Sequence, residues 1–271
     1  MNNKSIIKRI IRKSRKILSR YQRNEDPAKE RKKKACILGR KLRLKKNNYI
    51  YRNNALKPLF YLPFYRNDYI QQTILTEGTY YEIESLDFVF KEWENGRARK
   101  NVKGGCVLDI GANIGNHMLY FFFECEIKHA YCFEPIESTY NILKRNVEIN
   151  NLENKVTLIN SAVGASESLA SVSFYDKTNI GATKISLEND GPIPVVSIDS
   201  LHVQDSIKLI KIDVEGFEKE VIEGCKETIA ENKPYILIEI QPENFDCINM
   251  KLNDLGYQYI WLNGINYFFF V

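Results

Sequence analysis

The sequence predicts an α/β fold in which a mostly parallel sheet ends in an antiparallel hairpin and follows a basic helical arm. From about residue 79, short Val/Ile/Leu-rich runs alternate with segments of helical period, which is typical of parallel strands joined by crossover helices. An Asn-Gly pair separates the last two strand-like runs and favours a tight hairpin turn. Residues 1–46 carry 19 Lys and Arg against 3 Asp and Glu, a net charge of +16, whereas the remainder carries −11.

Length and composition predict one folded domain with an appendage, because 271 residues with 44% hydrophobic content can bury one substantial core. We expect a basic arm over residues 1–46, an aromatic-rich linker or lid over 47–78, and the main domain over 79–271. The sequence has no apolar run long enough to span a membrane and no secretory signal at its start. These features predict a soluble, cytoplasmic protein.

Cysteine and histidine spacing gives no sign of a metal site. The six cysteines form no C-x-x-C pair, and none of the three histidines lies at a zinc-ligand spacing from a cysteine or another histidine. Several cysteines lie inside apolar runs, where a small thiol packs well. We therefore expect a reducing compartment and no bound metal.

The start of the arm has the pattern of a basic amphipathic helix. Within residues 1–24, isoleucines and a leucine fall on one side of a helical wheel, and Lys and Arg fill the other. Such a helix suits an anionic membrane surface, nucleic acid phosphates or an organellar presequence, and it can equally be a solvated tail. Nucleic acid is the less favoured partner, because the rest of the chain is acidic.

Residues 47–78 are rich in aromatic side chains and include Pro58 and Pro63. Two interpretations are open, an extended segment that packs back on the domain and a lid over a pocket. Aromatic side chains bury large areas wherever they occur, which favours the first.

The sequence of the main domain predicts five strands and four helices, followed by the hairpin. The predicted strands are Cys106–Ile110, Ala130–Glu134, Val156–Ser161, Ile207–Ile212 and Tyr235–Ile240. The predicted helices lie around Gly115–Phe123, Ile136–Asn150, Phe217–Ile229 and Glu243–Leu255. The turn-rich region 168–200 predicts an antiparallel insertion after the third strand. Tyr257–Leu262 and Ile265–Phe270 predict the hairpin, with positive φ at both Asn263 and Gly264.

The run from Asp109 to Gly115 reads as a strand end, a glycine-bearing loop and the start of a helix. Gly111 and Gly115 allow tight turns and a close approach of the loop, with Ala112 and Asn113, to a ligand. Asp109, two residues before the first glycine, would repel a pyrophosphate and attract a cationic ligand. We therefore expect a ligand that carries positive charge.

Glu134 ends the second strand, 23 residues after Gly111. An acid at this place can accept hydrogen bonds from both hydroxyls of a ribose. Pro135 then helps to end the strand, and Ser161, at the end of the third strand, lies where the edge of an adenine would fall. Together with the glycine loop, these residues predict a nucleoside-binding site.

Four short motifs of the chain resemble those of a known protein family. D-I-G-A-N-I-G at 109–115, F-E-P at 133–135, K-I-D-V-E-G-F-E at 211–218 and I-E-I-Q-P at 238–242 resemble the FkbM family of methyltransferases. The resemblance covers roughly residues 80–271, and Asn113 replaces the middle glycine of the broader pattern, as is usual in this family. It implies a Rossmann-like class I methyltransferase fold, S-adenosylmethionine as cofactor, and a hydroxyl acceptor in a carbohydrate or natural product.

Methyl transfer to a hydroxyl needs a side chain that takes the acceptor's proton. Candidates at the carboxyl ends of the central strands are Asp213, Glu239 and Glu215, with His117 early in the first helix. Asp213 ranks first because it leaves the strand beside the topological switch point. Glu239 ranks second, because an acid inside an apolar strand must find a partner or point into a site.

Three functions remain open on the sequence alone. The leading one is O-methylation of a saccharide or lipid-linked saccharide at an anionic membrane face, with the arm as anchor. A second is RNA or protein methylation with phosphate contacts from the arm, and a third is a non-catalytic module that binds S-adenosylmethionine. A nicotinamide oxidoreductase is disfavoured by Asp109. Neither the acceptor nor the oligomeric state can be read from these residues.

Overall fold

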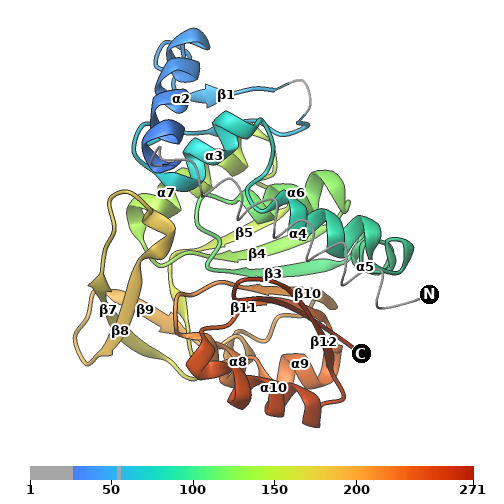
Figure 1. Cartoon of the computed structure of the whole chain (residues 1–271). Coiled ribbons are helices and arrows are strands. Elements are labelled where there is room, and N and C mark those ends of the chain that lie inside the picture. The colour runs from blue at the N-terminus through green and yellow to red at the C-terminus, as the bar shows by residue number, and fades with distance from the viewer. Residues whose placement is uncertain (1–26, 54–55) are drawn as a thin grey trace.

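The computed structural model describes residues 27–53 and 56–271, and its main element is a seven-stranded sheet (Figure 1). Five strands are parallel: β3 (Cys106–Ile110), β4 (His129–Phe133), β5 (Val156–Ile159), β10 (Ile207–Ile212) and β11 (Tyr235–Glu239). The strand order is β12-β13-β11-β10-β3-β4-β5. The chain therefore reverses its direction of travel across the sheet between β3 and β10, which confirms the predicted switch point.

Helices cover both faces of this sheet (Figure 1). One face carries α4 (Ile83–Asp87), α5 (Arg97–Val102), α6 (Asn116–Glu124) and α7 (Glu137–Ile149), and the other carries α8 (Glu218–Gly224), α9 (Lys226–Asn232) and α10 (Phe245–Asp254). Each face has its own apolar core, because neighbouring residues of a strand point to opposite sides. Strands buried on both faces explain the continuous apolar runs of the sequence.

Two helical regions differ from the prediction. The helix predicted over 217–229 is two helices, because Cys225 leaves helical geometry and Asp199, far away in sequence, caps the start of α9 by accepting from the amides of Glu227 and Thr228. A short 3-10 turn, η5 (Pro242–Asn244), precedes α10. The π-helical turn η1 (Phe88–Glu92) and the 3-10 turn η2 (Trp93–Asn95) were not predicted.

The insertion forms a separate four-stranded sheet of order β6-β9-β7-β8. Its strands are β6 (Ala162–Val163), β7 (Ser168–Phe174), β8 (Lys184–Glu188) and β9 (Ile193–Val196). β7 is antiparallel to β8 and β9, as predicted, whereas β6 and β9 are parallel. The turns η3 (Ile180–Ala182) and η4 (Asp199–Leu201) complete this region.

The terminal hairpin consists of β12 (Gln258–Asn263) and β13 (Asn266–Phe270), with β13 between β11 and β12. The hairpin prediction is confirmed, but the predicted turn geometry is wrong. Asn263 pairs with Asn266, so the loop residues are Gly264 and Ile265, and only Gly264 has positive φ, at 47°. Positive φ at the first loop residue alone is the pattern of a type II′ turn.

The part of the chain before α4 packs against α7 and shares the apolar core on that face of the sheet. It contains α2 (Pro27–Lys41), β1 (Ile50–Tyr51), β2 (Phe60–Tyr61) and α3 (Tyr69–Glu77). Asn150, which caps the end of α7, exchanges two hydrogen bonds with the backbone of Leu59, and Phe60 is fully buried. This favours the packed-segment interpretation of residues 47–78. The amphipathic helix predicted over 1–24 lies outside the described residues.

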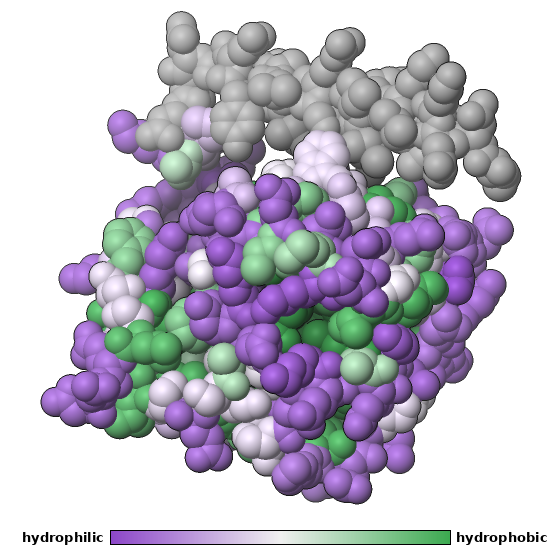
Figure 2. All heavy atoms as spheres, turned by 90° about the horizontal axis from the view of Figure 1, so that it is seen from below, coloured by the Kyte–Doolittle hydropathy of each residue, from purple (hydrophilic) through white to green (hydrophobic). Residues whose placement is uncertain are grey.

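The surface seen from below the view of Figure 1 is mostly hydrophilic, with apolar groups exposed between (Figure 2). In the described residues, the exposed large apolar side chains include Val172, Phe174 and Leu187 of the insertion. No helix within 27–53 or 56–271 is long and apolar enough to cross a membrane.

Candidate active site

A cavity opens at the carboxyl ends of β3, β4 and β10, on the edge where open α/β sheets bind ligands. Residues from the glycine loop, the ends of β4 and β5, the insertion and the loop after β10 line it: Gly111, Asn113, Glu134, Pro135, Ser161, Ile180, Gly181, Thr183, Asp213 and Glu215 among them.

The glycine loop has a backbone that requires its glycines. Gly111 has a φ of 73°, and a Cβ there would lie 1.8 Å from the carbonyl oxygen of Asp213. Gly115 has a φ of 85° and opens α6. The amides of Gly111 and Ala112 both donate to the carbonyl of Phe133, at 3.0 and 2.9 Å. The loop is thereby held against the ends of β4 and β10.

Glu134 lies in the cavity wall with both carboxylate oxygens anchored. Its Oε2 accepts from the amide of Asn113 at 2.9 Å, and its Oε1 accepts from the amide of Ile136 at 3.0 Å. Burial raises the pKa of Glu134 to about 7, although these amide donors act to lower it. Each oxygen keeps a free lone pair with which it can accept from a ligand.

Two more polar atoms of the cavity wall point to a polar ligand. Ser161 Oγ and Asn113 Oδ1 are buried and find no hydrogen-bond partner within the described part of the chain. Buried polar groups are nearly always satisfied, so such atoms mark places where a ligand or water completes the bonding. Ser161 thus lies in the wall where the sequence predicted a nucleoside contact.

Asp109 lies elsewhere than expected. Its side chain is fully buried, does not line the cavity, and faces Lys211, whose Nζ lies 3.5 Å from Asp109 Oδ1. The positive charge that the sequence analysis assigned to a ligand is therefore supplied by the protein. The reason is register, since Asp109 and Lys211 are cross-strand neighbours in β3 and β10.

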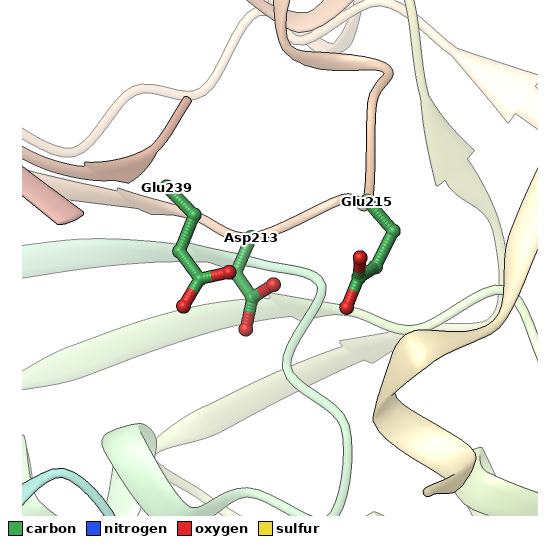
Figure 3. A group of neighbouring side chains, drawn as sticks. All are labelled: Asp213, Glu215 and Glu239. Atoms are coloured by element: carbon green, nitrogen blue, oxygen red, sulfur yellow. The ribbon is translucent and has the colours of Figure 1, made fainter. Parts of the chain in front are cut away.

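Three carboxylates that were predicted separately meet at the ends of β10 and β11 (Figure 3). Asp213, Glu215 and Glu239 each place an oxygen within 4.8 Å of the others. Three oxygens at such spacing could coordinate a divalent cation. Lys211 Nζ, 3.4 Å from Asp213 Oδ2, already supplies positive charge to the group.

Two of these carboxyl groups, Glu239 and Glu215, have raised pKa values. The charge of Asp213, together with burial, raises the pKa of Glu239 well above its ordinary value. Burial, with a contribution from Asp213, raises the pKa of Glu215 to about 7. Glu239 therefore holds a proton more tightly than an ordinary glutamate, and its Oε1 accepts from Asn266 Nδ2 at 3.2 Å.

His117 does not line the cavity. It is buried on α6, and its Nε2 lies 3.3 Å from Glu82 Oε2. Burial acts to raise the pKa of Glu82, but the hydrogen bond and charge of His117 lower it overall. Asn266 donates to both Glu82 and Glu239, so His117 reaches the carboxylate group only through other side chains.

Sequence reasoning missed Lys211 and Asp68. Lys211 interrupts an apolar strand as Glu239 does, and the same signal could have singled it out. Asp68 is fully buried, accepts from Gln71 N at the start of α3, and accepts from Ile180 N in the insertion. Asp68 thereby connects the aromatic segment to the loop around Ile180, which forms the roof of the cavity. A sequence pattern could not have revealed this contact, because the two residues are far apart in the chain.

The sheet order and the cavity at its switch point define a Rossmann-like class I methyltransferase fold. The family model described as "Methyltransferase FkbM domain" matches residues 109–259, which is more than half of the chain. The chain therefore belongs to the FkbM methyltransferase family, as the sequence motifs indicated.

The individual proteins to which the chain is similar share less than a third of its residues in the matched regions. A solved FkbM methyltransferase from Methylobacillus flagellatus KT has the same fold, with a TM-score of 0.50 and 20% identity, over 76% of this chain and 55% of that one. The hexuronic acid methyltransferase AglP of Haloferax volcanii is 29% identical over 138 residues, 49% of this chain and 54% of AglP. "Methyltransferase 1" of Beauveria bassiana is 26% identical over 173 residues, 54% of this chain and 68% of that protein. The match thus spans about half of AglP and two thirds of the second relative.

Proposed function

We propose that the chain is an S-adenosylmethionine-dependent methyltransferase that methylates a hydroxyl of a saccharide or glycoconjugate. The observation that carries the proposal is Glu134, whose two oxygens are fixed by backbone amides in the cavity wall and keep lone pairs for a ligand. Membership of the FkbM family supports methyl transfer, and the similarity to a hexuronic acid methyltransferase supports a saccharide acceptor.

The residues present fit this cofactor. Glu134 would accept hydrogen bonds from the ribose hydroxyls, and Ser161 Oγ, which lacks a partner among the described residues, would contact the adenine edge. Gly111 and Asn113 would form the floor, and Pro135 part of the wall. Ala112 and Gly115, which were predicted to bind the cofactor, do not line the cavity and act through the shape of the loop. Asp109 would act indirectly, through Lys211 and the loop. When bound, S-adenosylmethionine supplies a methyl group on a positively charged sulfur.

Asp213 is the proposed base. It lines the cavity, its side chain is 26% exposed, and it is the carboxylate of the group that contacts Lys211. In this position it would accept the proton of the acceptor hydroxyl, a role that typically contributes a factor of about 10² to 10⁴ in rate. Glu215 is the alternative base at higher pH, since its raised pKa of about 7 keeps part of it protonated near neutrality.

Calorimetric titration with S-adenosylmethionine tests the cofactor assignment. We expect Glu134→Ala to bind at least about tenfold more weakly than the wild type, because hydrogen bonds to a charged acceptor are lost. Glu153→Ala, an exposed acid before β5, is the matched control and should bind like the wild type. Absence of binding to the wild type would overturn the proposal.

Transfer of labelled methyl groups into saccharide fractions tests the activity. Asp213→Asn should keep cofactor binding and lose turnover, and full turnover in this variant would refute the base assignment. Cofactor binding by the wild type without methylation of any saccharide, RNA or protein fraction would instead favour a non-catalytic module.

A membrane role for the arm is part of the proposal. The described part of the arm continues the positive charge of residues 1–24, since α2 exposes Lys32, Lys33 and Lys34 together with apolar Ile37. Basic groups beside apolar side chains suit an anionic bilayer better than RNA. Sedimentation with phosphatidylglycerol vesicles should capture the chain in a salt-sensitive way, and deletion of 1–24 should reduce capture. Binding to RNA but not to these vesicles would reverse the choice.

A further inference from the structure

Lys211 is a buried cation that contacts both the glycine loop and the proposed base of the candidate site. Only 3% of the residue is exposed, although it is a lysine, and it lies next to the last residue of β10. Its Nζ donates to the carbonyl of Gly111 at 2.6 Å and lies 3.4 Å from Asp213 Oδ2. One ammonium group thus contacts the glycine loop and the proposed base together.

The sheet register creates this arrangement. Lys211 is paired with Asp109 on β3, and Asp213 follows two residues later, so all three side chains leave the same face of the sheet. Asp213 is also close to the loop through its backbone, because its carbonyl oxygen lies where a Cβ of Gly111 would be. Any movement of the Lys211 side chain would therefore disturb the loop and Asp213 at once.

The charge around Lys211 is strongly negative. Besides Asp213, carboxyl groups on several elements act on Lys211: Asp109 on β3, Glu239 on β11, Glu82 before α4 and Glu215 after β10. Two basic groups act on these acids in turn, since His117 on α6 faces Glu82 and Lys184 on β8 interacts with Glu215. Within the described residues, Lys211 is the only lysine or arginine whose nitrogen lies within 4.0 Å of Asp109 or Asp213. Burial lowers the pKa of Lys211, but the carboxylates, Asp213 first, raise it more, so it stays charged.

We propose that Lys211 is a positioning residue for methyl transfer, whose buried ammonium holds the Asp213 carboxylate beside the glycine loop in its charged, proton-accepting form. This inference rests on the proposed function. Without Lys211, Asp213 would lie near Glu239 and Glu215 with no cation in contact, and like charges at such distances favour uptake of a proton.

A purely structural role is the alternative, in which Lys211 only neutralises the buried Asp109. Lys211→Met alone cannot separate the two roles, because it leaves Asp109 as an uncompensated buried charge and can unfold the chain. The double variant Asp109→Asn with Lys211→Met removes both buried charges, so neither charge is left buried without its partner. Asp109→Asn alone is its matched control, because it keeps the ammonium, and Lys211→Arg tests whether a different cation restores the effect.

The decisive measurement is the titration of the Asp213 carboxyl by carbon NMR in the full chain, assigned through Asp213→Asn. In the double variant we expect its midpoint to move to higher pH by about one unit relative to Asp109→Asn, and Lys211→Arg to stay near the wild type. Superimposable titrations of the double variant and its control would overturn the proposal.

A parallel titration with S-adenosylmethionine separates failure of this inference from failure of the proposed function. The double variant should bind the cofactor about tenfold more weakly than Asp109→Asn, since the Gly111 carbonyl loses a charged donor. If the wild type does not bind the cofactor, the proposed function fails, whatever the Asp213 titration shows. If the wild type binds it and the Asp213 midpoint is unmoved, only the role of Lys211 fails.

Discussion

Gly111 lies where the glycine loop meets the backbone of Asp213, and its missing side chain makes this contact possible. We expect Gly111→Ala to lower the free energy of unfolding by about 2–4 kcal/mol, from a steric clash at 1.8 Å added to an unfavourable φ of 73°. Urea unfolding measures this loss. Gly264→Ala is the control, because it has positive φ but no atom within 4 Å of the added Cβ, and it should cost only about 1 kcal/mol. Equal losses in the two variants would count against the contact.

Glu134 should make cofactor binding depend on pH. Its pKa of about 7 means that it gains its charge near neutrality, and the charged form is the better acceptor for ribose hydroxyls. Affinity for S-adenosylmethionine should therefore rise as the pH rises from 6 to 8, which calorimetry at several pH values can follow. Glu134→Gln should flatten this dependence, and an unchanged slope in that variant would assign the effect to another group.

The same raised pKa has the opposite effect on the stability of the cofactor-free chain. The folded chain holds the Glu134 proton more tightly than the unfolded chain, whose pKa is near 4.5. This contribution to stability is complete below about 4.5 and is lost as the pH rises through about 7. Binding and stability thus respond to pH in opposite directions.

Single residues also mark the limit of prediction from sequence. Glu134, Ser161 and Asp213 were predicted at strand ends and do line the cavity, because the carboxyl ends of parallel strands share one edge. Asp109 met the same criterion yet faces Lys211, because the direction of its side chain depends on strand register and on a partner about 100 residues away. The mutual effect of Asp213 and Glu239 likewise needs distances that no spacing in the chain gives.

At the scale of elements, Asp68 connects α3 to the roof of the cavity. Asp68→Asn keeps one oxygen acceptor but cannot accept from both Gln71 N and Ile180 N with the same geometry. We expect a loss of about 1–3 kcal/mol in stability and faster hydrogen exchange at the amide of Ile180. Asp190→Asn, an exposed acid of the insertion, should change neither. Unchanged exchange at Ile180 in Asp68→Asn would mean that the roof is held elsewhere.

The strand ends that carry Asp213 and Glu239 should not need a metal ion. Lys211 Nζ lies 3.4 Å from Asp213, and a divalent cation bound between the carboxylates would meet its positive charge at short range. We expect no saturable binding of Mg²⁺ or Mn²⁺ by calorimetry and no loss of methyl transfer in EDTA. Stoichiometric metal binding that is lost in Asp213→Asn would contradict this expectation.

The bounds of helices and strands were predicted correctly where they depend only on which residues are buried. β3 and β10 begin and end where the apolar runs do, because strands buried on both faces tolerate few polar residues. The break at Cys225 was missed because helical period continues across it, and Asp199, which caps the new helix, is distant in sequence. The turn at Gly264 was misjudged by one residue, which changes the loop from Asn-Gly to Gly-Ile.

On the scale of the whole molecule, the charge is divided between two regions. The basic residues concentrate in the arm and the acids in the sheet domain, whose candidate site gathers several carboxylates around one lysine. A site of this charge should attract a cationic cofactor and repel polyanions such as RNA. The sequence already predicted this division, although it did not predict that Lys211 would lie at the centre of the acidic group.

The position of β13 has a consequence for biosynthesis. β13 lies between β11 and β12, so the sheet ends at β11 until residues 258–270 emerge from the ribosome. Until then β11 is an unpaired, apolar edge on a nascent polypeptide, and such edges are prone to aggregate. Pairing of β13 with β11 therefore covers this edge, and a ribosome that stalls before residues 258–270 would hold a chain on which the edge is still open.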